Sequence, residues 1–197
     1  MVRLRAVHRL WVLTVLLFAC SYNAQGQHQK DAAANPVPVT KLEAFLAKTG
    51  SVTIRGSSEI GSVGGDVLVD AVEFRDAANS RLRVTGLSID VKESGRLERD
   101  STSFVDYDEI DSLLQGIDYI SRVDASVTLM KNFDATYTTK GDFSVTASSE
   151  NHGGAFVSSG TIGRVVAVLK LSDLPRLSSL IQNGKDIIDS ATKNAKP

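Results

Sequence analysis

Side chains suited to nucleophilic or metal chemistry are scarce in this sequence. It has three histidines and a single cysteine, Cys20. His28 falls in a polar, alanine-rich stretch, and His152 falls in the turn-forming sequence Asn-His-Gly-Gly at 151–154. No pair has the His-x-x-x-His or Cys-x-x-Cys spacing that zinc sites use. The sequence therefore predicts no catalytic residue, no metal ligand and no cofactor.

Serines are numerous, yet none lies in the Gly-x-Ser-x-Gly pattern of a nucleophile elbow. A serine or aspartate would have to recruit His152 as its base, and a hydrolase with such a cryptic Ser/Asp–His site is the alternative to a non-enzymatic protein. The glycine-rich segment 61–65 lacks both the Gly-x-Gly-x-x-Gly spacing and a P-loop lysine. It is typical of a hairpin turn rather than of a phosphate-binding loop.

Acidic residues are densest at 106–111, where Asp106, Asp108, Glu109 and Asp111 follow Asp100. Several carboxylates could hold calcium or magnesium. The spacing departs from an EF-hand, however, and acids also favour a helix N-terminus because they oppose its positive dipole end. The cluster is therefore interpreted as the start of a helix, with Asp106 as its N-cap.

Basic residues do not form a nucleic-acid patch. The segment 96–100 mixes both signs, and with Arg81 and Arg83 it is interpreted as a solvated strand end. Loss of the first 26 residues would remove three arginines and no acid, leaving 19 Lys and Arg against 23 Asp and Glu. A mildly acidic domain has no electrostatic reason to bind nucleic acid or anionic membranes.

The N-terminus has the layout of an export signal. Arg3, Arg5 and Arg9 precede ten apolar residues at 10–19, a run shorter than the roughly 20 residues that span a bilayer. Small residues at Ala24 and Gly26 predict cleavage before residue 27. Alternatively, residues 17–20 (Leu-Phe-Ala-Cys) resemble a bacterial lipobox, although the Phe departs from it, and Cys20 would then carry a lipid anchor. We expect soluble release, with lipidation at Cys20 as the alternative.

Downstream, the hydrophobic period alternates between helix and strand. A flexible leader at 27–38 precedes one β-rich domain at 39–192, and 193–197 form a tail. Helical patterns are expected at 40–46, docked by Leu42, Phe45 and Leu46, at 106–121, and at 172–192, with Ser172 as cap. Strand patterns begin near 51, 66, 82, 127, 133, 143, 155 and 164.

The strand at 82–91 changes parity, because Leu82 and Val84 are even-numbered whereas Leu87, Ile89 and Val91 are odd-numbered. A β-bulge at Gly86 would keep both halves facing the core. Short connections imply antiparallel neighbours. The predicted fold is α+β: a curved antiparallel sheet or partly open barrel of seven to eight strands with a short N-terminal helix, an inserted helix and a C-terminal helix.

These patterns predict an exported protein of the bacterial envelope or periplasm, most simply a non-enzymatic binding or interaction module. The sequence does not identify the partner; a small apolar ligand or another protein would suit such a module, and no nucleic acid is expected. No transmembrane helix is expected in the mature chain.

Overall fold

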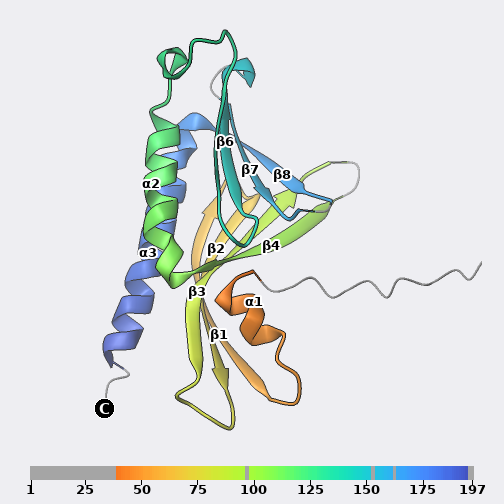
Figure 1. The fold of residues 1–197 in the computed structure, drawn as a ribbon, viewed down its shortest axis with the longest axis vertical. Helices are drawn as coiled ribbons and strands as arrows, with labels where there is room; N and C mark the ends of the chain where they lie inside the picture. The colour runs from red at the N-terminus through yellow and green to blue at the C-terminus, as the bar shows by residue number, and fades with distance from the viewer. Residues whose placement is uncertain (1–38, 96–97, 152–153, 162, 195–197) are drawn as a thin grey trace, which may run out of the picture. The chain divides into compact units, whose positions relative to one another are not determined.

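The computed structural model describes residues 39–95, 98–151, 154–161 and 163–194 (Figure 1). The predicted signal, leader and Cys20 lie outside these residues, as do His28 and His152. The predictions made for those positions are therefore not addressed by the fold.

Among the residues described, eight antiparallel strands form two open four-stranded sheets. The first sheet has the order β1 (Thr53–Val63), β2 (Val67–Asp76), β3 (Arg83–Glu93), β4 (Arg99–Asp106). The second has the order β5 (Asp134–Thr138), β6 (Ser144–Ser148), β7 (Gly154–Ser159), β8 (Val165–Lys170). The α+β class and a count of eight strands are thus confirmed, but the strands divide between two sheets instead of forming one.

In the described segments, three α-helices accompany the sheets: α1 (Lys41–Leu46), α2 (Ile110–Ser121) and α3 (Leu174–Asn194). Single 3-10 turns occupy Tyr107–Glu109, Ala125–Val127, Ser149–Asn151 and Leu171–Asp173. Helix α1 has the predicted capping box between Thr40 and Glu43, but Leu46 is 44% exposed, so Leu42 and Phe45 alone dock it. In the described part of the chain, no helix is both long and apolar enough to span a membrane.

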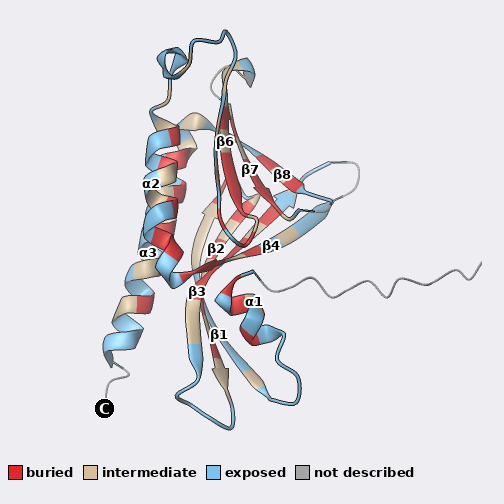
Figure 2. Ribbon diagram, viewed as in Figure 1, coloured by how far each residue is buried: buried red, intermediate tan, exposed pale blue. Residues whose placement is uncertain are grey.

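The first sheet is covered on both faces, by different elements. Helices α1 and α3 lie on opposite sides of it, and the two faces are called here the α1 face and the α3 face (Figure 1). On the α3 face, the inner half of the sheet (67–71 of β2 and 87–91 of β3) packs into the main core with α2, α3 and the second sheet. Figure 2 shows buried residues concentrated there and along the facing sides of α2 and α3.

In the outer half of the sheet (72–76 of β2 and 83–86 of β3), the buried side chains point the other way. Val72 and Phe74 pack on the α1 face against Leu42 and Phe45 of α1. Val84 and Phe104 join this second cluster, in which the Phe74 and Phe104 rings meet edge-to-face at 5.8 Å. Alternate residues of a strand point to opposite faces, so the core changes face along the strand.

This change of face explains the parity slip in β3, and the predicted bulge at Gly86 is wrong. Pairing with β2 runs without a break from Arg83 to Val91, and the first sheet's register shift lies in β1, between Glu59 and Gly61. A Cβ atom on Gly86 would lie 2.2 Å from the carbonyl oxygen of Val105 and 2.7 Å from Leu42 Cδ1. Gly86 is therefore required for close approach of β4 and α1.

Two strand assignments also differ. Residues 127–130 form no strand, and Leu129 and Met130 are exposed. The fourth strand is instead β4, which the sequence does not indicate because hydroxyl and charged residues precede its single apolar pair, Phe104 and Val105.

Helix α3 is continuous through Gly184, where a glycine costs helix stability but permits contact with the sheet. A Cβ atom there would lie 2.6 Å from Leu87 Cδ2. Beside its N-terminus, Asp173, rather than the predicted Ser172, accepts a hydrogen bond from the Lys170 N–H at 3.1 Å. Helix α3 thus touches the sheet most closely at its middle.

Candidate functional site

A groove of about 790 Å³ opens between the outer half of the first sheet and the C-terminal end of α3. It lies on the α3 face, where the outer half of the sheet no longer contributes to the main core. Beyond the close contact at Gly184, the helix continues for ten residues to Asn194, and Ile188 is its last buried residue. A twisted sheet and a straight helix diverge away from their point of contact, which leaves the space open.

Small and polar residues form the floor of the groove, in rows set by strand pairing. Gly56 of β1 pairs with Glu73 of β2, which pairs with Thr85 of β3. In the next row outward, Arg75 pairs with Arg83. No atom lies within 4 Å of the position that a Cβ atom on Gly56 would occupy, so this edge of the floor is open space.

One wall is apolar. Ile187, Ile188 and Ala191 of α3 line the groove opposite the arginines. Ile187 is 41% exposed, whereas Ile188 reaches down to the core and is 5% exposed. An apolar molecule lying along this wall would cover side-chain surface that now faces water.

The sheet side of the groove is positively charged. Arg75 and Arg83 of the floor and Arg81 of the turn between β2 and β3 line it, and Glu73 is the acidic residue among them. Glu73 Oε1 lies 3.9 Å from Arg75 Nε and 3.8 Å from Arg83 Nη1, distances too long for hydrogen bonds. The guanidinium groups therefore keep donors for another acceptor.

The turn between β2 and β3 holds Arg81 at the mouth of the groove. Asp76 Oδ1 accepts hydrogen bonds from the backbone N–H groups of Ala78 and Asn79, at 2.8 and 3.1 Å. Asn79 Oδ1 in turn accepts from the Arg81 N–H at 3.1 Å. These are the Asx-type contacts expected for Asp and Asn in a turn.

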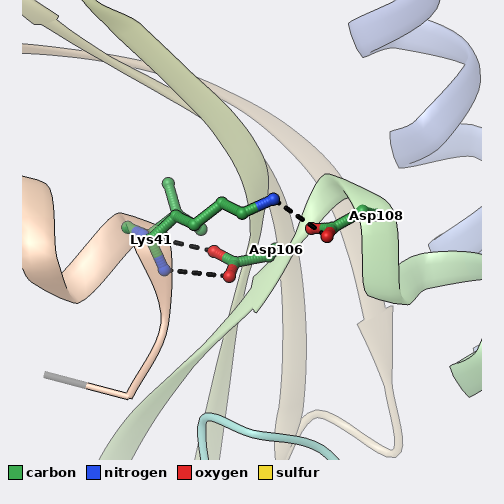
Figure 3. A network of polar contacts seen from close by, with 4 residues as sticks. Lys41, Asp106 and Asp108 are labelled. Atoms are coloured by element: carbon green, nitrogen blue, oxygen red, sulfur yellow. Dashed lines mark hydrogen bonds and ion pairs between the residues drawn. The ribbon is translucent and has the colours of Figure 1, made fainter.

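The acidic cluster at 106–111 is dispersed among structural contacts. Asp106 does not cap its own helix but accepts from the N–H groups of Lys41 and Leu42, at 2.8 and 3.2 Å, at the start of α1. Asp108 pairs with the Lys41 ammonium at 2.8 Å (Figure 3). Their hydrogen bond lowers the pKa of Asp108 and raises the pKa of Lys41.

The remaining acids of that cluster point elsewhere. Glu109 Oε1 accepts from the Lys140 N–H at 2.9 Å, and Asp111 pairs with Lys185 at 2.5 Å. Across the described ranges, no three His, Cys, Asp or Glu side chains come together in a way that could hold a metal ion. The acids therefore connect different elements of the fold. The cluster does precede helix α2, as predicted, but the partners of its individual acids were not predicted.

A second acidic site lies on the α1 face of the inner half. Burial, followed by the negative charges of Asp90 and Glu59, raises the pKa of Asp70. Ser88, which pairs with Asp70 across the strands, is 1% exposed, and within the described residues its hydroxyl has no hydrogen-bond partner. Neither residue lines the groove, and the pair is not treated as a binding site.

The groove residues were missed by sequence reasoning, which assigned Arg81 and Arg83 to a solvated strand end and passed over Glu73 and Arg75. A signal was nevertheless present. The odd-numbered positions of β2 are Val67, Val69 and Ala71, and then become charged at 73 and 75. A strand face that changes from apolar to charged marks the place where the core ends on that face.

Fold and groove together define a two-sheet α+β protein with an amphipathic cleft beside its C-terminal helix. No protein-family model matches this chain, and neither a curated protein nor a solved structure matches it significantly. Functional conclusions consequently rest on the groove itself.

Proposed function

We propose that the protein is a non-enzymatic binding module of the bacterial envelope or periplasm, and that the groove beside α3 is its binding site. The observation that carries this proposal is the groove's combination of size and lining. A concave site of several hundred Å³ with an apolar wall and a few converging polar groups is the usual form of a small-molecule site. The volume of about 790 Å³ falls in that range.

The groove also explains a feature that packing does not. Ile187 and Ala191 form an apolar stripe on α3 that faces the groove rather than the core. If the C-terminal end of α3 served only to cover the sheet, it would pack directly against the sheet. The separation between them is consistent with a role for the groove in binding.

A fluorescence titration tests the proposal. N-phenylnaphthylamine is neutral and becomes fluorescent in apolar surroundings, so it should bind in the groove. The Cβ atom of Gly56→Phe would meet no atom within 4 Å, so its ring can occupy the open edge of the floor, and this variant should abolish the signal. Val168→Phe places the same ring on β8, at a position that is 67% exposed and outside the groove, and it should leave the signal unchanged. Dye binding that Gly56→Phe leaves intact would contradict the proposal.

The proposed location depends on the N-terminal signal and is tested separately. Fractionation of the wild type and Cys20→Ser distinguishes the two processing routes. A wild type in the soluble periplasmic fraction, unaltered by Cys20→Ser, supports release. A membrane-bound wild type that becomes soluble in the variant supports a lipid anchor.

A further inference from the structure

We infer that the ligand of this groove is an anionic amphiphile, bound as a single molecule, with its acidic group at the arginines and its apolar chain along α3. This inference rests on the proposed function and specifies the ligand's chemical class. It goes beyond the small apolar ligand that the sequence suggests, because one groove is lined by arginines on the sheet side and by apolar residues of α3.

The first argument is the local charge. Three arginines and one glutamate line the groove, whereas the whole chain has a net charge of −1. A positive site on a protein that is slightly negative overall selects for an anion at this place. Guanidinium groups bind carboxylates and phosphates through paired N–H donors, which makes arginine the favoured residue for such groups.

The second argument is the incomplete pairing of these charges. Arg75 and Arg83 share a single carboxylate at 3.9 and 3.8 Å, and their side chains are 43% and 34% exposed. An acidic ligand group could enter between them and accept hydrogen bonds at normal distances, because no existing hydrogen bond with Glu73 has to be broken. Arg81 also lines the groove and is exposed, so its guanidinium group can donate a further hydrogen bond to that acidic group.

The third argument is the position of the apolar wall. Ile187, Ile188 and Ala191 face the arginine rows across the groove, so head and chain of one molecule would be bound together. A second groove, of about 610 Å³ between α2 and α3, provides a contrast. Its lining includes Asp118 and no lysine or arginine, so it lacks the cationic half of the arrangement.

Displacement of the bound dye tests the ligand class. Decanoate, decanol and decyltrimethylammonium share the same chain length and differ in the charge of the head. Decanoate should displace N-phenylnaphthylamine at a concentration about tenfold lower than the ammonium compound, with decanol in between. Added salt should reduce the difference, because these arginines are partly exposed.

Charge-removal variants show whether the groove arginines are responsible. The double variant Arg75→Gln with Arg83→Gln should still bind the dye but lose the preference for decanoate. Arg99→Gln is the matched control, since Arg99 is an exposed arginine of the same sheet that pairs with Glu93 at 2.5 Å and lies outside the groove. It should retain the tenfold preference.

The outcomes separate this inference from the proposed function. Dye binding in the groove with equal displacement by all three competitors would overturn the anion inference and leave the binding proposal standing. Absence of dye binding would overturn the binding proposal. Cosedimentation with phosphatidylglycerol vesicles that decanoate does not compete away would indicate a membrane surface as the partner and overturn the inference of a single bound molecule.

Discussion

The two halves of the first sheet use the same strands in opposite ways. In the inner half, Val69, Leu87 and Ile89 face α3 and the second sheet. In the outer half, Phe74 and Val84 face α1, and the α3 face is left to charged and small residues. Each half is thus covered by a substantial core on one face only.

This difference shows how a small domain can provide a binding surface on a regular sheet. Burial of apolar area on one face is sufficient to hold a strand in place. In the outer half, α1 buries the apolar side chains of the sheet on the α1 face. The α3 face then does not need apolar residues for packing, and it can carry arginines, a glutamate and glycine. The short helix α1 is therefore a structural precondition for the groove, although it lies on the other side of the sheet.

The largest expected effect comes from removing the core of the outer half. Phe74→Ala should lower the free energy of unfolding by about 3 to 5 kcal/mol, because a fully buried aromatic ring and its contact with Phe104 are lost. Glu73→Ala, one residue away on the groove face, should change it by about 0.5 kcal/mol or less. Urea denaturation measures both. Equal losses in the two variants would refute the assignment of the faces.

Gly86→Val should cost about 3 kcal/mol, because the new side chain would overlap the β4 backbone and Leu42 at the point where the core changes face. Gly56→Ala, on β1 in the same sheet, meets no atom within 4 Å and should be tolerated within about 0.5 kcal/mol. Thermal or urea unfolding gives the comparison. A tolerated valine at position 86 would mean that β4 and α1 do not approach as closely as described.

Asp106→Ala should cost about 2 kcal/mol, because two N–H groups at the start of α1 lose a buried acceptor. Loss of α1 contacts should also increase proteolysis near residue 46. Asp108→Ala removes a neighbouring acid whose partner, Lys41, is exposed, and it should leave the unfolding midpoint unchanged. If the two variants behave alike, Asp106 does not hold α1.

The smallest effect concerns the inner half. Since the folded state raises the pKa of Asp70, this carboxyl favours folding below its ordinary pKa, and that contribution is lost as pH rises through the raised value. Asp70→Asn should therefore increase stability at about pH 7, by no more than about 1 kcal/mol after solvent screening. The gain should disappear near pH 3, as urea titrations at both pH values would show. A variant less stable than the wild type at neutral pH would contradict this sign.

Sequence patterns predicted the helices and most strands because these depend on local signals. The Thr40–Glu43 capping box and the 110–120 apolar stripe are each contained within one element. The bulge at Gly86 was wrong because parity alone cannot distinguish an inserted residue from a core that changes face. That distinction depends on α1, which lies some forty residues earlier in the chain.

The groove was not predictable from the sequence for a similar reason. Arg75, Arg83 and Ile187 come from three elements, and their arrangement depends on where α3 leaves the sheet. Gly184 determines where α3 leaves the sheet, because it permits close contact with Leu87. In the sequence alone, this glycine indicates only a loss of helix stability. Only the change from Ala71 to Glu73 and Arg75 on one parity of β2 hinted at the open face.

The hydrogen bonds of Asp106 have a consequence for the order in which the chain folds. Helix α1 has six residues, too few to persist alone in water, and its acceptor lies 65 residues further along the chain from Lys41. Because the chain is synthesised from its N-terminus, α1 cannot dock until β4 has been made and has paired with β3. Pulsed hydrogen exchange during refolding should therefore show the amides of Lys41 and Leu42 gaining protection after those of β2 and β3. Helix α1, the first of the described elements in chain order, is thus among the last of them to fold, and it docks onto a sheet that already exists.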